Sequence, residues 1–274
     1  MAGVLNLQSR QQETNTNKTK FSIFAGKNNE QYYNAFHSNA GNDYSFLISS
    51  SYYKTDGFNL PASFSNPLQR TSSRIRSDNK SFNLFGKGEY RVTSRTKLSI
   101  TAMFVHSEKG VPFEIDVSNP RFWYYPELKN YTIALNGEHI FKTFAPANLA
   151  FTFSRIKQNS VIEQFTDISY SQKDDIELTD DLTYNGKINF TQLIRKNSLL
   201  KIGLSGFTST HKEKFMSDNF TEQTYLHNIL SGGIEYEYFT KNFITVAGVG
   251  FDFSSTPKTG DKVSKKGISD YAFN

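Results

Sequence analysis

The sequence predicts an all-β protein, an antiparallel up-and-down β-barrel that crosses a membrane. Three observations predict this fold. Apolar residues recur at every second position in run after run, which is the period of a strand with one apolar face. The connections between the runs alternate between short and long. The 274-residue chain is also rich in strand-forming aromatics, with 25 Phe and 15 Tyr. Many of them fall near the ends of the runs, where an interfacial aromatic girdle would place them.

The alternation predicts eleven strands, and residues 84–105 show how each is recognised. Leu84 and Tyr90 fall on one face of the first run, while Lys87 and Glu89 fall on the other. After a short polar turn the alternation restarts, which predicts a hairpin. The same pattern along the chain gives strands at 20–25, 31–38, 43–53, 80–92, 97–106, 130–141, 148–156, 182–194, 198–209, 225–239 and 243–253.

The connections predict how these strands are arranged. Short links at 39–42, 93–96, 142–147, 195–197 and 240–242 alternate with long ones at 54–79, 107–129, 157–181 and 210–224. The first link, 26–30, is the one short member of the long series. Outer-membrane barrels have short turns at one end and long loops at the other. The less apolar face of the strands carries Asn, Lys, Thr and Glu, which suits a watery lumen.

A soluble β-sandwich or propeller remains an alternative, because alternation alone does not say whether the apolar face meets lipid or a protein core. No Cys is present, so disulfides and thiolate–metal sites are excluded. No apolar run approaches the roughly 18 residues of a membrane-spanning helix, and no secretory signal follows Met1. The net charge of +5 is scattered rather than clustered, so nucleic-acid binding is not predicted.

The sequence predicts no enzymatic activity. Its five His residues lie far apart, and no zinc-protease, serine-hydrolase or phosphate-binding loop motif occurs. No cofactor is therefore expected, apart from the calcium considered below.

The first candidate site is an aromatic patch between two prolines. Arg121 is followed by four consecutive aromatics, Phe122, Trp123, Tyr124 and Tyr125. One interpretation is a ligand-contacting rim in an extracellular loop, where aromatic rings stack on a bound molecule. The other, which we favour, is that these rings belong to the aromatic girdle or pack the loop.

The second candidate site is an acidic run at 172–181. Clustered carboxylates are the ligands that calcium takes, although the spacing does not match an EF-hand loop. A solvated acidic loop is the alternative, and the one we favour. The residues concerned are Asp174, Asp175, Glu177, Asp180 and Asp181.

The chain resembles the TonB-dependent receptors of Gram-negative outer membranes. In that family the plug domain ends in a strand of the form Ala/Gly-Gly-Val-Ile-Asn-Ile, and Gly3–Leu7 match it. A polar linker follows here, as it does in the family. Further matches are "YYKTDGF" (52–58), "SFNLFGKGEY" (81–90) and "NPRFWYYPEL" (119–128), in the family's order.

The resemblance implies a domain organisation. Residues 1–10 would end the plug domain, 11–19 would form the linker, and 20–274 would form the first half of the barrel. Family members have 22 strands around a plugged lumen, so the eleven predicted strands would be an open half barrel. The bulk of the plug, the TonB box and a closing aromatic strand are not evident, and the chain is therefore expected to be a fragment.

The resemblance also implies a function. The complete protein would bind a scarce nutrient such as a ferric siderophore or cobalamin, and the TonB complex would drive its uptake. Expected partners are outer-membrane lipid, the plug, the C-terminal half of the barrel and the small ligand. Two alternatives stay open: a passive porin-like or structural outer-membrane barrel, and a soluble secreted β-sheet binding domain.

Overall fold

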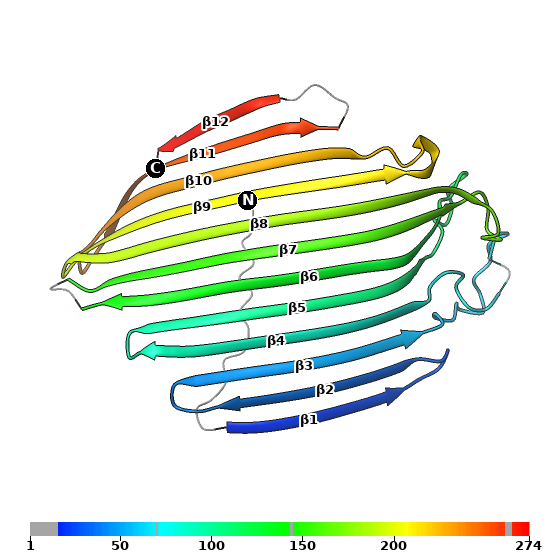
Figure 1. The fold of residues 1–274 in the computed structure, drawn as a ribbon, viewed down its shortest axis with the longest axis horizontal. Coiled ribbons are helices and arrows are strands. Elements are labelled where there is room, and N and C mark those ends of the chain that lie inside the picture. Colours follow the sequence, from blue (N-terminus) through cyan, green and yellow to red (C-terminus); the bar gives the residue numbers. More distant parts are fainter. Residues whose placement is uncertain (1–15, 70, 143–144, 261–264, 274) are drawn as a thin grey trace.

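The computed structural model describes residues 16–69, 71–142, 145–260 and 265–273, which form one antiparallel sheet (Figure 1). Its twelve strands pair in chain order, each with its neighbours in the sequence. No helix in these ranges is long and apolar enough to cross a bilayer. The strands are β1 (Thr16–Ala25), β2 (Gln31–Ala40), β3 (Tyr44–Thr55), β4 (Asn79–Thr93), β5 (Thr96–Val111), β6 (Phe122–Phe141), β7 (Ala147–Phe165), β8 (Lys173–Arg195), β9 (Ser198–Phe215), β10 (Gln223–Phe239), β11 (Ile244–Thr259) and β12 (Lys265–Phe273).

The predicted up-and-down half barrel is confirmed. All eleven predicted strands are present, and β12 follows them. The first strand begins at Thr16, so residues 16–19 of the predicted linker belong to β1. The predicted plug end at 1–10, and the linker as far as residue 15, lie outside the described residues.

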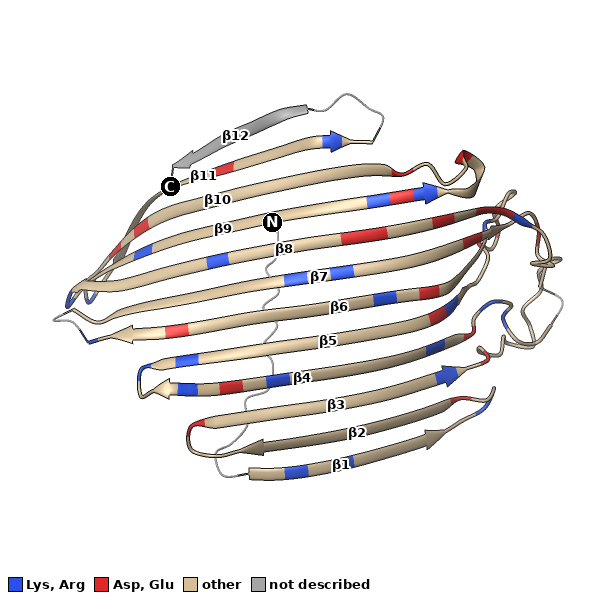
Figure 2. Cartoon of the chain, viewed as in Figure 1, with Lys and Arg blue, Asp and Glu red and all other residues tan. Residues whose placement is uncertain are grey.

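Three of the predicted long loops are wrong in extent, because the strands beside them continue. β6, β7, β8 and β9 are 20, 19, 23 and 18 residues long, whereas about 9–11 residues cross the hydrocarbon of a bilayer. Their extra residues, at 122–129, 157–165, 173–181 and 210–215, are called the extension here. Charged residues are frequent along these parts of the strands (Figure 2). Apolar alternation does not mark them, because apolar and polar side chains occur on both of their faces.

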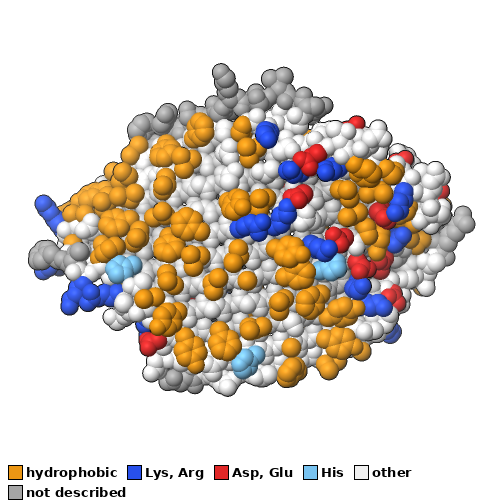
Figure 3. All heavy atoms as spheres, viewed as in Figure 1, with side chains coloured by type: hydrophobic (Ala, Val, Ile, Leu, Met, Phe, Trp, Pro, Cys, Tyr) orange, Lys and Arg blue, Asp and Glu red, His pale blue; other side chains and the backbone are white. Residues whose placement is uncertain are grey.

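The two faces of the sheet differ in the spanning part, at residues 131–141, 147–156, 182–195 and 198–209 of the same four strands. Apolar side chains such as Leu135, Phe153 and Leu204 stand on the outer face, each more than 40% exposed. Apolar side chains are spread widely over the face seen in Figure 3, and charged side chains gather toward its right side. Asn136, Asn185 and Lys187 stand on the opposite, inner face. Buried apolar side chains in the described ranges are few: Ala40, Phe113, Ala147, Ile162 and Phe165.

This arrangement does not match the soluble sandwich or propeller that the sequence left open. A sandwich buries its apolar face against a second sheet, whereas the described strands form a single layer. Strand pairing therefore holds the sheet together, with little apolar core of its own.

Aromatic rings cover glycines on the outer face. Gly137 lies directly opposite Phe151, and a Cβ atom at Gly137 would stand 2.3 Å from that ring. Gly232 and Phe251 repeat the arrangement on β10 and β11, with the Cβ position 2.6 Å from the ring. Only glycine leaves room for such a ring, which shields the strand backbone that glycine leaves bare.

Candidate functional site

A hollow of about 640 Å³ lies on the inner face of the extension. The end of β5, the 112–121 loop and strands β6 to β8 form it. Among its lining residues are Lys109, Arg121, Trp123, Tyr125 and Asp181. The hollow is thus lined by three of the five residues of the predicted aromatic patch and by one residue of the predicted acidic run.

Glu114 fixes Arg121 at the edge of this hollow. The Arg121 Nε donates to Glu114 Oε1 at 2.5 Å, and the backbone N–H of Arg121 donates to Oε2 of the same carboxylate at 2.7 Å. These hydrogen bonds hold the pKa of Glu114 below its usual value. The Arg121 guanidinium stands 4.6 Å from the centre of the Trp123 ring, a cation–π contact. Ion pair and ring together orient Trp123 toward the hollow.

The aromatic patch is not in a loop, which corrects that prediction. Phe122–Tyr125 are the first residues of β6, and side chains along a strand alternate between its faces. Trp123 and Tyr125 line the hollow. Phe122 and Tyr124 instead pack among the loops, with Phe122 6.1 Å from Phe113 between ring centres. A bulge between Tyr124 and Glu127 shifts the register just beyond the patch.

A small cluster around Phe113 ties the long 56–78 loop to the extension. Phe113 is 1% exposed and Arg74 is 6% exposed. The Arg74 guanidinium lies over the Phe113 ring at 4.2 Å and donates to the Phe113 carbonyl and to Gln69 Oε1. Arg76 lies over the Tyr124 and Tyr170 rings, at 4.4 Å from each. Buried hydrogen bonds and stacking therefore hold this loop beside the hollow.

The acidic run is not a loop either, because it lies within β8. Its side chains alternate, so Asp175, Glu177 and Asp181 share the inner face while Asp174 and Asp180 point outward. Asp180 contacts Lys157 on β7. Asp175 accepts hydrogen bonds from the Ser217 backbone N–H at 3.0 Å and from the Ser217 hydroxyl at 2.6 Å.

The five carboxylates therefore do not converge on one point. No group of three or more His, Asp or Glu side chains in the described parts of the chain is arranged to hold a metal ion. A strand separates neighbouring carboxylates onto opposite faces, whereas a calcium loop turns them toward one centre. The calcium interpretation gains no support from this geometry.

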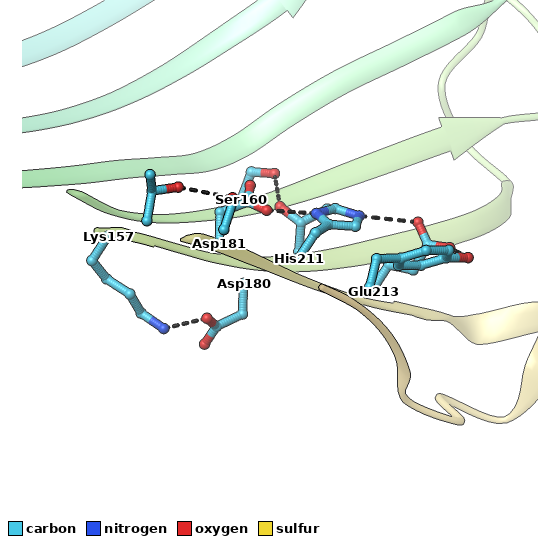
Figure 4. A network of polar contacts seen from close by, with 10 residues as sticks. Lys157, Ser160, Asp180, Asp181, His211 and Glu213 are labelled. Carbon is cyan, nitrogen blue, oxygen red and sulfur yellow. Dashed lines mark hydrogen bonds and ion pairs between the residues drawn. The ribbon is translucent and has the colours of Figure 1, made fainter. Parts of the chain in front are cut away.

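His211, which no sequence motif indicated, links two acids beside the hollow (Figure 4). Its Nδ1 lies 2.5 Å from Asp181 Oδ1, and its Nε2 lies 3.2 Å from Glu213 Oε2. The Tyr225 hydroxyl donates to Glu213 at 2.7 Å. The available signal was His211 and Glu213 two residues apart, hence on one face of a strand. Their partner Asp181 comes from another strand, which a local pattern does not show.

Two acids around one imidazole favour its protonated form. Burial alone would lower the pKa of His211, but the hydrogen bonds to Asp181 and Glu213 outweigh burial and raise that pKa above its usual value. Burial, followed by the nearby charge of Glu213, raises the pKa of Glu177. The hollow thus presents aromatic rings, cations and the Asp181 carboxylate, and His211 contacts that carboxylate from beside the hollow. Such a surface can stack on a ligand and hydrogen-bond to it.

The fold defines the class of the molecule. It is a segment of a large outer-membrane-type β-barrel, with an apolar outer face, a polar inner face, short turns at one end and longer loops at the other. No protein-family model matches the chain, and no curated protein is similar to it in sequence. Solved structures share its fold.

Three solved structures illustrate this likeness. The copper transporter OprC superposes with a TM-score of 0.73 at 11% identity, over 96% of this chain and 42% of that one. The FrpB iron transporter from Neisseria meningitidis (F5-1 variant) gives 0.70 at 14%, over 96% and 44%. FpvAI, in its complex with pyocin S2, gives 0.64 at 12%, over 95% and 40%. The expected resemblance to TonB-dependent receptors is confirmed at the level of fold. The chain spans less than half the length of each.

Proposed function

We propose that this chain forms part of the barrel wall of a TonB-dependent receptor in the outer membrane of a Gram-negative bacterium. The observation that carries the proposal is the single-layered sheet, whose outer face exposes apolar side chains on each strand from β1 to β11. Such a face is unfavourable in water, but it is the face that a barrel turns toward lipid.

The partners follow from the two edges and the two faces of the sheet. β1 and β12 form the edges of the described sheet, and open edges are not tolerated within a bilayer. The C-terminal half of the barrel would pair with these strands. Lipid would cover the outer face, and a plug domain would fill the lumen against the inner face. The TonB complex would act through the complete protein.

The transported molecule would be a scarce nutrient such as a ferric siderophore or cobalamin. OprC is a copper transporter and FrpB is an iron transporter, which supports uptake of a metal-containing nutrient as the general class. The hollow supplies the ligand contacts in this proposal, with Trp123 and Tyr125 stacking on the ligand and Arg121 hydrogen-bonding to it.

An uptake assay tests the proposal against the passive alternative. Radiolabelled ferric siderophores and cobalamin are supplied to cells with and without the gene, each in a background with and without TonB. We expect the gene to raise uptake of one of these ligands only where TonB is present. Uptake that needs the gene but not TonB would instead establish a porin-like channel.

Two variants then test the hollow within the same assay. Replacing Trp123 and Tyr125 together with Ala removes both stacking rings, and we expect the apparent affinity for the transported ligand to fall at least tenfold. The control replaces Tyr131, an aromatic on the outer face, with Ala. Equal losses in both variants would show that the hollow is not the ligand contact.

A further inference from the structure

The outer face carries an apolar groove of about 840 Å³ across strands β5 to β10. Its floor is formed by Gly186 on β8 and Gly206 on β9, which are directly paired. The surface sinks at Gly206, where the nearest atom to a Cβ position is 4.0 Å away, while the Phe153 ring lies 3.3 Å from the Cβ position of Gly186. Ile133, Leu135 and Phe153 line one side of the groove, and Leu204 and Leu230 line the other.

One cation stands in the wall of this groove. Arg155 on β7 pairs with Ile133 on β6 and with Tyr184 on β8. No hydrogen bond or ion pair to its guanidinium occurs among the described residues. The next outward residue, Lys157, contacts Asp180 and lies in the extension. Arg155 therefore marks the level at which the apolar outer face gives way to charged residues.

An unpaired guanidinium on a lipid-facing strand is costly unless an anion compensates it. At the boundary between hydrocarbon and water, the anion at hand is the phosphate of a lipid headgroup. Guanidinium and phosphate geometries match, with two parallel N–H···O hydrogen bonds. Tyr184 beside Arg155 fits the same level, because aromatic girdles mark the interfaces of such barrels.

We propose that the groove binds one acyl chain of a phosphate-bearing lipid, whose phosphate accepts hydrogen bonds from Arg155. This proposal rests on the proposed membrane barrel. The lining is apolar apart from the cation and a few hydroxyl and amide groups, which suits an amphipathic anion. A peptide strand fits less well, because the floor strands are already paired on both sides and offer no unpaired backbone groups.

Native mass spectrometry of the full chain in detergent micelles tests the proposal. Three probes separate the contributions: dioleoyl phosphatidate, dioleoylglycerol with the same acyl chains but no phosphate, and glycerol phosphate with no chains. We expect phosphatidate to be retained about tenfold more tightly than dioleoylglycerol, since a charge-assisted pair distinguishes them. Glycerol phosphate should not be retained. Equal retention of the two lipids would overturn the proposal.

Matched variants locate the site. Arg155→Gln should abolish the preference for phosphatidate, whereas Arg95→Gln, at a turn far from the groove, should keep it. Gly206→Val should fill the groove and weaken retention of both lipids several-fold, because the nearest atom to a Cβ there is 4.0 Å away and nothing clashes. Gly86→Val is its control, since Gly86 has open space on the same face but lies outside the groove.

The outcomes separate this proposal from the one on which it rests. A β-sheet circular dichroism spectrum in detergent, with no effect of Arg155→Gln or Gly206→Val on lipid retention, would overturn the lipid site and leave the barrel intact. A folded, β-structured chain that is monomeric and soluble without detergent would overturn both.

Discussion

The spanning part and the extension of strands β6 to β9 belong to one continuous ladder of paired strands. Their outer faces nevertheless differ in chemistry, because the first is mainly apolar and the second carries ion pairs. In the spanning part the outer face carries Leu135, Phe153, Ile188 and Leu204. A few residues further along the same strands it carries ion pairs such as Lys157 with Asp180 and Lys212 with Glu222. Backbone pairing does not change at the boundary, so side-chain chemistry alone records the change of surroundings.

The spanning part and the extension share strand pairing but differ in what else stabilises them. Strand pairing continues through both parts, so it does not explain the switch in side chains. In the spanning part the apolar outer face needs a nonpolar solvent. Beside the extension, the Phe113 cluster, which joins the 112–121 and 56–78 loops, supplies a small buried core of its own. The two parts should therefore respond differently to the same kind of substitution.

The largest expected effect comes from emptying the Phe113 cluster. Phe113→Ala removes a ring that is 1% exposed and stacks under Arg74. We expect a loss of about 3–5 kcal/mol in the local stability of the loop, the usual cost of truncating a buried Phe. Hydrogen exchange of residues 56–78 measures it. Phe58→Ala, at a 54% exposed ring of the same loop, should leave exchange nearly unchanged. Equal increases in exchange for the two variants would mean that the Phe113 cluster does not stabilise this loop.

The second effect distinguishes the two faces of the spanning part. Ile188→Lys places a charge on the outer face and should cost about 2–4 kcal/mol when the protein is in a bilayer. Asn189→Lys, one residue along, points to the inner face and should cost far less. Urea unfolding of the complete barrel in vesicles, where both edges of the sheet are paired, compares the two. Similar losses would mean that the outer face does not meet lipid.

The spanning part of the strands could be predicted from the sequence, whereas the extension could not. The spanning strands were predictable because their two faces meet different surroundings, which imposes a period of two on residues such as Ile133 and Ile188. The extension was not predictable, because apolar and polar side chains occur on both of its faces and no period of two results. The predicted loops at 107–129, 157–181 and 210–224 are the consequence.

The candidate site was predicted in part, for a related reason. The composition of the aromatic patch identified Arg121, Trp123 and Tyr125, which do line the hollow. His211 was missed because its partner Asp181 lies 30 residues away in the sequence. The Phe113 cluster joins residues 39 apart. Contacts of this range depend on strand register, which local patterns do not fix.

A smaller effect concerns pH and the extension alone. The folded state raises the pKa of His211 through Asp181 and Glu213, so protonated His211 stabilises the folded protein. This contribution is full below the unfolded pKa of about 6.5 and is lost as the pH rises through the raised folded value. We expect about 1 kcal/mol or less, because the side chain is 36% exposed and water screens the pair.

The measurement compares the wild type with His211→Gln between pH 5 and pH 9. The stability difference between them should shrink as the pH rises. His227→Gln provides the control, since His227 contacts Ser254 and no carboxylate among the described residues. A difference that is constant with pH would show that His211 does not titrate in this window.

The smallest effect is expected for ion pairs at the outer surface of the extension. Glu222 accepts hydrogen bonds from Lys212 and Lys214, which lower its pKa. All three side chains are well exposed, so salt and water screen the pairs. Glu222→Gln should therefore leave urea unfolding unchanged in moderate salt. A large loss in the free energy of unfolding would mean that lipid, rather than water, surrounds this part of β9. The boundary placed near Arg155 would then have to move outward along the strands.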